Sequence, residues 1–140
     1  MEYLRIEINS NNDVWRLIDK SLEYNLLLNF RPNEILEWWK TDIHLKQGKI
    51  LKGITVRDLQ FDLITDLKGL KELLQLNVHQ FEIYQFNKPV SDTFRIQSLP
   101  GDNKEKILQD NGLVHIFDCR FEILQISSMD TKFIAKIKNH

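Results

Sequence analysis

The sequence contains a single cysteine, Cys119, so no disulfide can form within the chain. This is typical of a protein that acts in a reducing compartment. The first residues, Met1 to Arg5, lack the basic and then apolar order of a signal peptide. No apolar run approaches the roughly 18 residues that a membrane-spanning helix needs. We therefore expect a cytoplasmic protein with no membrane partner, and the abundance of Asn, Ile, Lys and Leu favours a bacterial source.

The chain also lacks an excess of charge of either sign. Its 19 basic and 20 acidic side chains leave a net charge of −1. That balance provides no strong field to attract nucleic acid, so we expect no nucleic-acid partner. Lys132, Lys136 and Lys138 share one parity near the end of the chain, and we interpret them as charges that keep an edge strand from aggregating.

Signatures of catalysis, metal binding and phosphate binding are missing as well. The four histidines are scattered, there is no Gly-x-Ser-x-Gly segment, and the five glycines form no phosphate-binding loop. His115 and Cys119 share a strand face but lie about 13 Å apart, too far to ligate one metal ion. Ser127 and Ser128 with Asp130 resemble a turn. We therefore predict no enzyme, no catalytic residue, no metal and no cofactor.

What the sequence does contain is a strand pattern of an aromatic, a polar and an aliphatic residue. Alternation of this kind fits the two-residue period of a strand and not the period of a helix. The 140 residues are enough for one domain with a substantial core, and we predict a single domain spanning residues 1–140. The pattern occurs at Phe61-Asp62-Leu63, Phe81-Glu82-Ile83, Phe94-Arg95-Ile96 and Phe121-Glu122-Ile123.

Periodicity, caps and turn residues along the chain predict an α+β fold. We expect a mostly antiparallel sheet of about five to seven strands, with two or three helices packed on one side. The predicted strands are Leu4–Ile8, Ile50–Val56, Leu59–Leu63, Phe81–Phe86, Thr93–Leu99, Leu113–Ile126 and Phe133–Ile137. The predicted helices are Asp13–Leu28, Glu34–Leu45, Asp66–Leu76 with Thr65 as its cap, and a short Lys104–Gln109.

The predicted long strand Leu113–Ile126 has two different faces. One face, which we assign to the core, consists of Leu113, His115, Phe117, Cys119, Phe121 and Ile123. The other consists of Val114, Ile116, Asp118, Arg120, Glu122, Leu124 and Ile126, and Tyr84 and Phe86 belong to the same side of their own strand. A solvated sheet face is rarely this apolar, so either helices or a partner must cover part of it.

These observations favour a non-catalytic protein-binding module. The most concrete form is a bacterial immunity or inhibitor protein that neutralises a partner, such as a toxin, by covering its surface; a homodimer through the same surface is equally compatible. Trp39 continues the apolar stripe of Leu36 and Ile43 in the predicted helix. Consecutive helical positions differ by about 100°, so Trp38 lies on the flank and both rings cannot face one core. An exposed tryptophan is favoured at interfaces. The predicted partner-binding residues are Trp38, Tyr84, Phe86, Arg120, Glu122 and Leu124.

The alternative is a small enzyme or ligand-binding protein with a pocket between sheet and helices. Its candidate residues are Glu82, Glu122, Arg95, Arg120 and His115. If the two Phe-Glu-Ile strands are neighbours, Glu82 and Glu122 approach each other and the pKa of one of them rises. A charge ladder across the strands is the simpler interpretation of the same residues.

Overall fold

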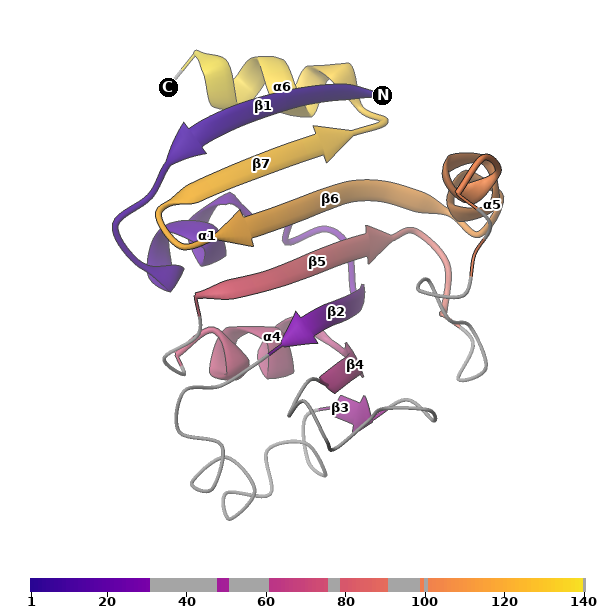
Figure 1. Cartoon of the computed structure of the whole chain (residues 1–140), viewed down its shortest axis with the longest axis horizontal. Helices are drawn as coiled ribbons and strands as arrows, with labels where there is room; N and C mark the ends of the chain where they lie inside the picture. Colours follow the sequence, from indigo (N-terminus) through magenta and orange to yellow (C-terminus); the bar gives the residue numbers. More distant parts are fainter. Residues whose placement is uncertain (31–47, 51–60, 76–78, 91–98, 100, 140) are drawn as a thin grey trace.

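Seven strands form one antiparallel sheet within the part of the chain that the structure describes (Figure 1). The structure is a computed structural model that describes residues 1–30, 48–50, 61–75, 79–90, 99 and 101–139. The predicted α+β class is confirmed, and the strands lie in the order β1-β7-β6-β5-β2-β4-β3. In chain order the elements are β1 (Glu2–Glu7), α1 (Asn11–Leu17), β2 (Tyr24–Phe30), β3 (Gly48–Ile50), β4 (Phe61–Thr65), α4 (Leu67–Leu73), β5 (Gln80–Phe86), α5 (Lys104–Asp110), β6 (Leu113–Arg120), β7 (Ile123–Ser128) and α6 (Thr131–Lys138).

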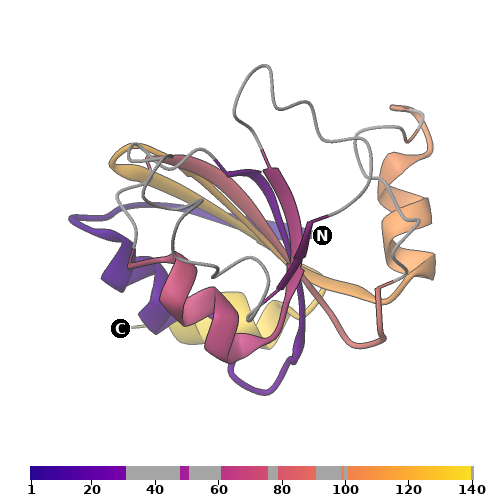
Figure 2. The ribbon, with the colours of Figure 1, turned by 90° about the horizontal axis from the view of Figure 1, so that it is seen from below.

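Helices cover the two faces of the sheet unequally (Figure 2). Helices α1, α4 and α6 pack on one face, here called the inner face, where Phe117 and Leu124 are fully buried. Helix α5 lies on the opposite, outer face, and its Leu108 belongs to a second buried cluster that also includes Tyr84, Phe86 and Leu113. Helix α5 therefore contributes to the cover of the apolar outer face, where the sequence allowed either helices or a partner. None of the described helices is long and apolar enough to cross a membrane.

The predicted strand Leu113–Ile126 is wrong, because the chain reverses in its middle. Strands β6 and β7 form a hairpin whose last pair is Arg120 opposite Ile123. The two residues between them shift the alternation, so Leu124 and Ile126 point into the inner core and Phe121 leaves it. Neither turn residue is Gly, Asn, Asp or Pro, so the usual sequence signal of a hairpin is missing.

The predicted helix Asp13–Leu28 is also wrong in its second half. Helix α1 ends at Leu17, and Ile18 has the extended ψ of 138°. The residues from Tyr24 onward form β2, which lies between β5 and β4. A central strand is buried on both faces and therefore has a continuous apolar sequence, which a short stretch of helix can match equally well.

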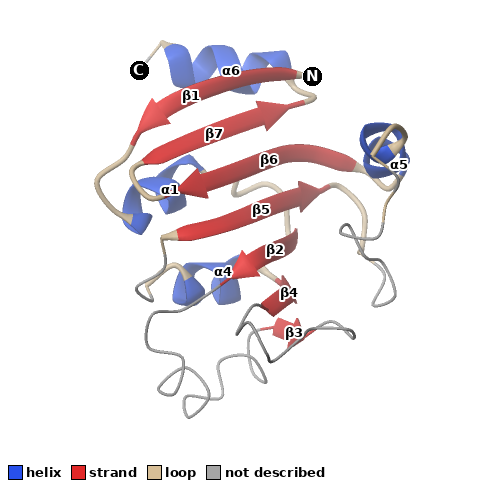
Figure 3. Cartoon of the chain, viewed as in Figure 1, coloured by secondary structure: helices blue, strands red, loops and turns tan. Residues whose placement is uncertain are grey.

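The predicted last strand, Phe133–Ile137, is a helix instead (Figure 3). The Asp130 side chain caps α6 by accepting hydrogen bonds from the N–H groups of Lys132 and Phe133. Ile134 is fully buried on the sheet. The three lysines of this segment are therefore exposed on a helix and do not lie on an edge strand.

Other predicted elements are confirmed within a few residues. They are the strands Leu4–Ile8 and Phe81–Phe86, now β1 and β5, and the helices Asp66–Leu76 and Lys104–Gln109, now α4 and α5. The α4 cap is Asp66, whose carboxylate accepts the Gly69 N–H at 2.8 Å, so the assignment to Thr65 is wrong. The predicted helix Glu34–Leu45, the strand Thr93–Leu99, most of Ile50–Val56 and the start of Leu59–Leu63 lie outside the described residues.

Candidate functional site

The turn between β6 and β7 exposes an aromatic ring in an unusual backbone conformation. Phe121 is the first of the two turn residues, its φ is +57°, and it is 60% exposed. Glycine is the preferred residue where a two-residue turn requires a positive φ, and a bulky side chain there is strained. Backbone strain of this kind is concentrated at functional sites, so Phe121 is a candidate binding residue.

Neighbouring segments hold this turn in place from two sides. The Phe121 N–H donates to the His79 carbonyl at 2.6 Å, and the Ile8 N–H donates to the Glu122 carbonyl at 2.8 Å. The Phe121 ring stacks on the His79 ring with centroids 5.9 Å apart and an interplanar angle of 15°. The end of β1 and the residue before β5 therefore fix both the backbone and the ring of the turn.

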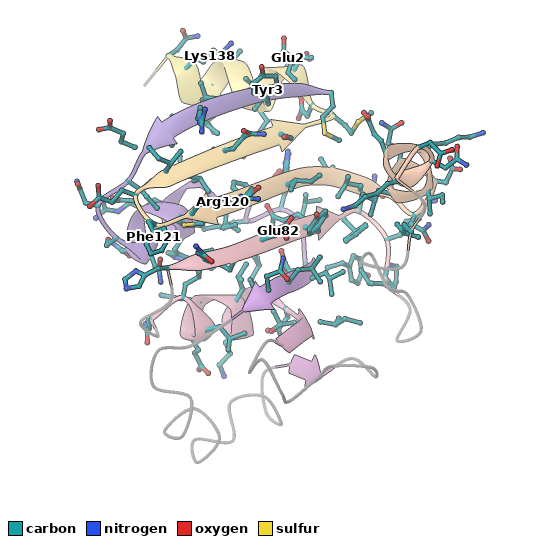
Figure 4. The ribbon with its side chains drawn as sticks, viewed as in Figure 1. Glu2, Tyr3, Glu82, Arg120, Phe121 and Lys138 are labelled. Carbon is teal, nitrogen blue, oxygen red and sulfur yellow. The ribbon has the colours of Figure 1, made fainter. Side chains whose placement is uncertain are left out.

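Charged side chains of opposite sign flank the exposed ring. Together, Arg120, Phe121 and Glu122 form what we call the hairpin tip (Figure 4). The Arg120 side chain is 76% exposed, and its Nε donates to Asp118 Oδ1 at 3.4 Å. Within the described residues, neither the terminal guanidinium nitrogens of Arg120 nor the Glu122 carboxylate has a hydrogen-bond partner.

An open cavity of about 930 Å³ lies beside the hairpin tip, and we call it the tip groove. The loop from β1 to α1, the end of α4 and the hairpin tip line it. Its wall includes the Trp15 ring, over which the Lys20 and Lys71 ammonium groups lie at 4.4 and 5.8 Å from the centroid. The groove thus combines flat rings with charges of both signs: Trp15, His79 and Phe121, with Glu7, Lys71, Arg120 and Glu122.

The predicted partner-binding residues divide between the hairpin tip and the interior. Arg120 and Glu122 lie together at the tip, as expected for exposed charges. Tyr84, Phe86 and Leu124 are buried, with 3%, 0% and 0% of their surface exposed, so they cannot be anchors on this surface.

Tyr84 and Phe86 are buried in the outer cluster, which includes residues of β2 and β6 besides Leu108 of α5, and Leu124 is buried because the turn shifts the alternation of β7. The Tyr84 hydroxyl donates to Glu82 at 3.0 Å, and burial, with the nearby Glu82 charge, raises the pKa of Tyr84 well above its ordinary value. Trp38 lies outside the described residues.

Sequence reasoning missed Phe121, His79 and Trp15 as components of a site. The predicted strand Leu113–Ile126 places Phe121 on the core face with Phe117 and Cys119, because Phe-Glu-Ile at 121–123 has the same alternation as the strand segment at 81–83. Trp15 lies in the predicted helix Asp13–Leu28, and nothing in the sequence relates it to a residue more than a hundred positions away. No sequence signal could have found the tip groove, because its walls come from distant segments.

A second polar arrangement lies on the inner face and has the residue types of a hydrolytic triad. His115 Nε2 is 2.8 Å from Asp19 Oδ2, and His115 Nδ1 is 2.7 Å from Ser128 Oγ. His115 and Ser128 are fully buried. The Ser128 oxygen also accepts the Asp130 N–H at 2.9 Å and lies 3.1 Å from the Asp130 carbonyl. A buried hydroxyl that already has these partners cannot attack a substrate, so the arrangement is structural.

The same network continues across the sheet through Gln85. Its side chain accepts the Asp19 N–H at 3.0 Å and donates to the Asp19 carbonyl at 3.1 Å and to Asn25 Oδ1 at 2.8 Å. Within the described residues, Asn25 Nδ2 has no hydrogen-bond partner. The network ties the loop before β2 to three neighbouring strands, and its role is to fix that loop.

The carboxylate pair Glu82 and Glu122, weighed as acid–base chemistry, does not form. Glu82 lies opposite Asp118 on β6, whereas Glu122 is in the turn. Both Glu82 oxygens are occupied, one by the Tyr84 hydroxyl and the other by the Asn29 amide. Arg95, the other cation considered for this face, lies outside the described residues. Among the described residues, no three His, Cys, Asp or Glu side chains gather closely enough to hold a metal ion.

Comparisons with protein-family models, with curated proteins and with solved structures found no match for this chain. The hairpin tip and the tip groove are therefore interpreted from their own geometry.

Proposed function

We propose that this chain is a non-catalytic protein-binding module that docks through its hairpin tip. The observation that supports this function most directly is Phe121, an exposed ring held rigidly in a conformation that costs free energy. Aromatic and arginine side chains dominate the energy of protein interfaces, and Arg120 adjoins the ring. Because the turn is already fixed, binding orders few side chains and loses little conformational entropy.

The open shape of the tip groove supports a protein partner over a small molecule. Small-molecule sites enclose most of their ligand. The tip groove is open and carries charges of both signs beside its rings, which is the mixture found at the rim of protein interfaces. A loop of a partner can rest in the groove while Phe121 contacts its surface.

The concrete form of this proposal is a bacterial immunity or inhibitor protein that acts in the cytoplasm by covering a partner such as a toxin. The small size of the chain and the pre-organised hairpin tip support it. It is also supported by the Asp19–His115–Ser128 arrangement, in which both ring nitrogens of His115 already have hydrogen-bond partners within the chain. Such a protein needs a rigid surface and no reactive group.

The alternative function, a small enzyme or ligand-binding protein, has the tip groove as its support. The groove lies at the end of the sheet, where residues of α1 and the end of α4 face the hairpin tip, so it partly matches the pocket between sheet and helices that this alternative expects. Of its expected residues, Glu82 has a hydrogen bond to each oxygen and His115 is buried, whereas Arg120 and Glu122 line the groove. Arg95 lies outside the described residues.

Affinity capture from the source cells tests the proposed function. We expect the wild-type chain to recover one stoichiometric protein, and the F121G variant to lose it, because glycine suits the turn but removes the ring. The matched control is Y3S, since Tyr3 is 66% exposed on β1 and lies away from the tip (Figure 4). Retention of the same partner by F121G, or recovery of no stoichiometric protein by the wild type, would contradict the proposal.

A further inference from the structure

The charges of the hairpin tip are complementary to a second copy of the same tip. A cation, a ring and an anion follow one another as Arg120, Phe121 and Glu122. A two-fold axis next to Phe121 places each Arg120 opposite the Glu122 of the other copy and brings the two rings together. We infer that a second copy of this chain binds at the hairpin tip; this inference rests on the proposed role of Phe121 as an anchor.

The free atoms of the tip suit this contact. Arg120 uses Nε on its own strand neighbour Asp118, so the two terminal nitrogens remain available. Those nitrogens form a planar fork that matches a carboxylate in a bidentate pair. The exposed face of Phe121 gains a second ring, and paired aromatic rings are favourable in offset or edge-on arrangements.

A second copy fits the tip better than a strongly charged partner does. The tip has one positive and one negative side chain, and the whole chain has a net charge of −1. Neither the tip nor the chain therefore attracts a partner of one predominant charge. In a two-fold pair, by contrast, both charges of each copy are neutralised by the other.

The tip lies at one end of the sheet, between the end of β1 and the start of β5, and its Phe121 side chain is exposed. A contact limited to two hairpin tips and the adjoining groove walls is smaller than a standard stable interface. We therefore expect weak, reversible pairing that rises with concentration. Because this pairing covers Phe121, another protein that uses the same ring must displace the second copy.

Sedimentation velocity on charge-swapped variants tests this inference. We expect the wild-type chain to form dimers between roughly 10 μM and 1 mM. In a two-fold pair, position 120 of each copy faces position 122 of the other. R120E therefore brings two carboxylates together at each contact, and E122R brings two guanidinium groups together, so each variant alone pairs about tenfold more weakly. In an equal mixture the R120E copy brings two carboxylates and the E122R copy two cations, so mixed dimers form about as readily as wild-type dimers.

A wild-type chain that stays monomeric throughout this range, or a mixture that pairs no better than its components, would overturn the inference. Both substitutions are at exposed positions, and circular dichroism checks that each variant is folded. F121G provides a second test, since removal of the ring should also abolish pairing. If the wild type is monomeric but F121G still loses a captured partner, the self-association fails while the proposed function stands.

Discussion

Phe121 has a conformation that its side chain disfavours, and its neighbours enforce it. The His79 carbonyl, the Ile8 N–H and the His79 ring together position the turn. A left-handed conformation costs a residue with a Cβ atom about 1–2 kcal/mol relative to glycine. That free energy is lost from stability, so the exposed ring must be useful in some other way.

Replacing Phe121 by glycine and by alanine separates the strain from the ring. Both variants lose the stacking on His79, but only F121G is relieved of the strained φ. We expect F121G to be more stable than F121A by about 1 kcal/mol. Urea unfolding followed by circular dichroism measures the difference. Equal stability of the two variants would mean that position 121 does not keep its positive φ in solution.

His115 is the other residue whose state depends on its surroundings. Burial lowers the pKa of His115 below its ordinary value, although the Asp19 carboxylate opposes this shift. For Asp19, burial raises the pKa, but hydrogen bonds with Ser21 and His115 outweigh it and lower the pKa overall. Since a carboxylate only accepts hydrogen bonds, Nε2 of the neutral ring carries the proton and Nδ1 accepts from Ser128.

This arrangement makes the stability of the fold fall in mild acid. Below pH 6.5, the ordinary pKa of a histidine, the unfolded chain binds a proton before the folded chain does. The free energy of unfolding then decreases by up to about 1.4 kcal/mol per pH unit for this one proton. The charged groups that face the ring, Asp19 and Asp130, reduce the effect.

Urea unfolding between pH 8 and pH 5 on the wild type and on H115Q measures this contribution. Glutamine keeps a polar side chain at the site but cannot take up a proton, so H115Q should show the shallower pH dependence. Identical pH dependence of the two proteins would show that His115 does not titrate differently in the folded chain.

Individual helices and strands differ most from the sequence prediction where one pattern fits two structures. Phe81-Glu82-Ile83 lies in a strand, whereas the same letters at 121–123 begin in a turn. In α6 the apolar residues Phe133 and Ile137 match both a strand and a helix, and the Asp130 cap decides for the helix. Strands β1 and β5 and helix α4 are predicted correctly, because the apolar residues of each follow a single period and turn or capping residues lie next to each element.

The turn from α5 into β6 offers a test at a glycine. Gly112 has a φ of +88°, and an added Cβ would lie 2.5 Å from the Asn87 side-chain oxygen. Gly101 has open space at the same place and serves as the control. We expect G112A to lower the free energy of unfolding by about 1–2 kcal/mol and G101A to change it little. Equal effects in thermal unfolding would argue against the left-handed turn.

Over the whole molecule, the proposed docking surface and the helical covers lie in different places. Helices α1, α4 and α6 shield the inner face and α5 shields part of the outer face, whereas the hairpin tip lies at the strand ends on one side of the sheet (Figures 1 and 2). The exposed side chains of the tip are not part of either buried cluster. The substitutions R120E, F121G and E122R should therefore alter binding without altering the fold.

Strand alternation, the apolar stripes of helices, and capping and turn residues were sufficient to predict the α+β class and the antiparallel character of the sheet. They also predicted four of the elements. These features depend on which residues are buried within a few positions, and that information is local. The strand order, the reversal at Phe121 and the meeting of Asp19 with His115 depend on contacts between distant segments, of which β1 and β7 pair although Glu2 and Ser128 lie at opposite ends of the chain. Such contacts follow from packing of the entire chain, because each apolar face can be buried in several ways until its partners are in place.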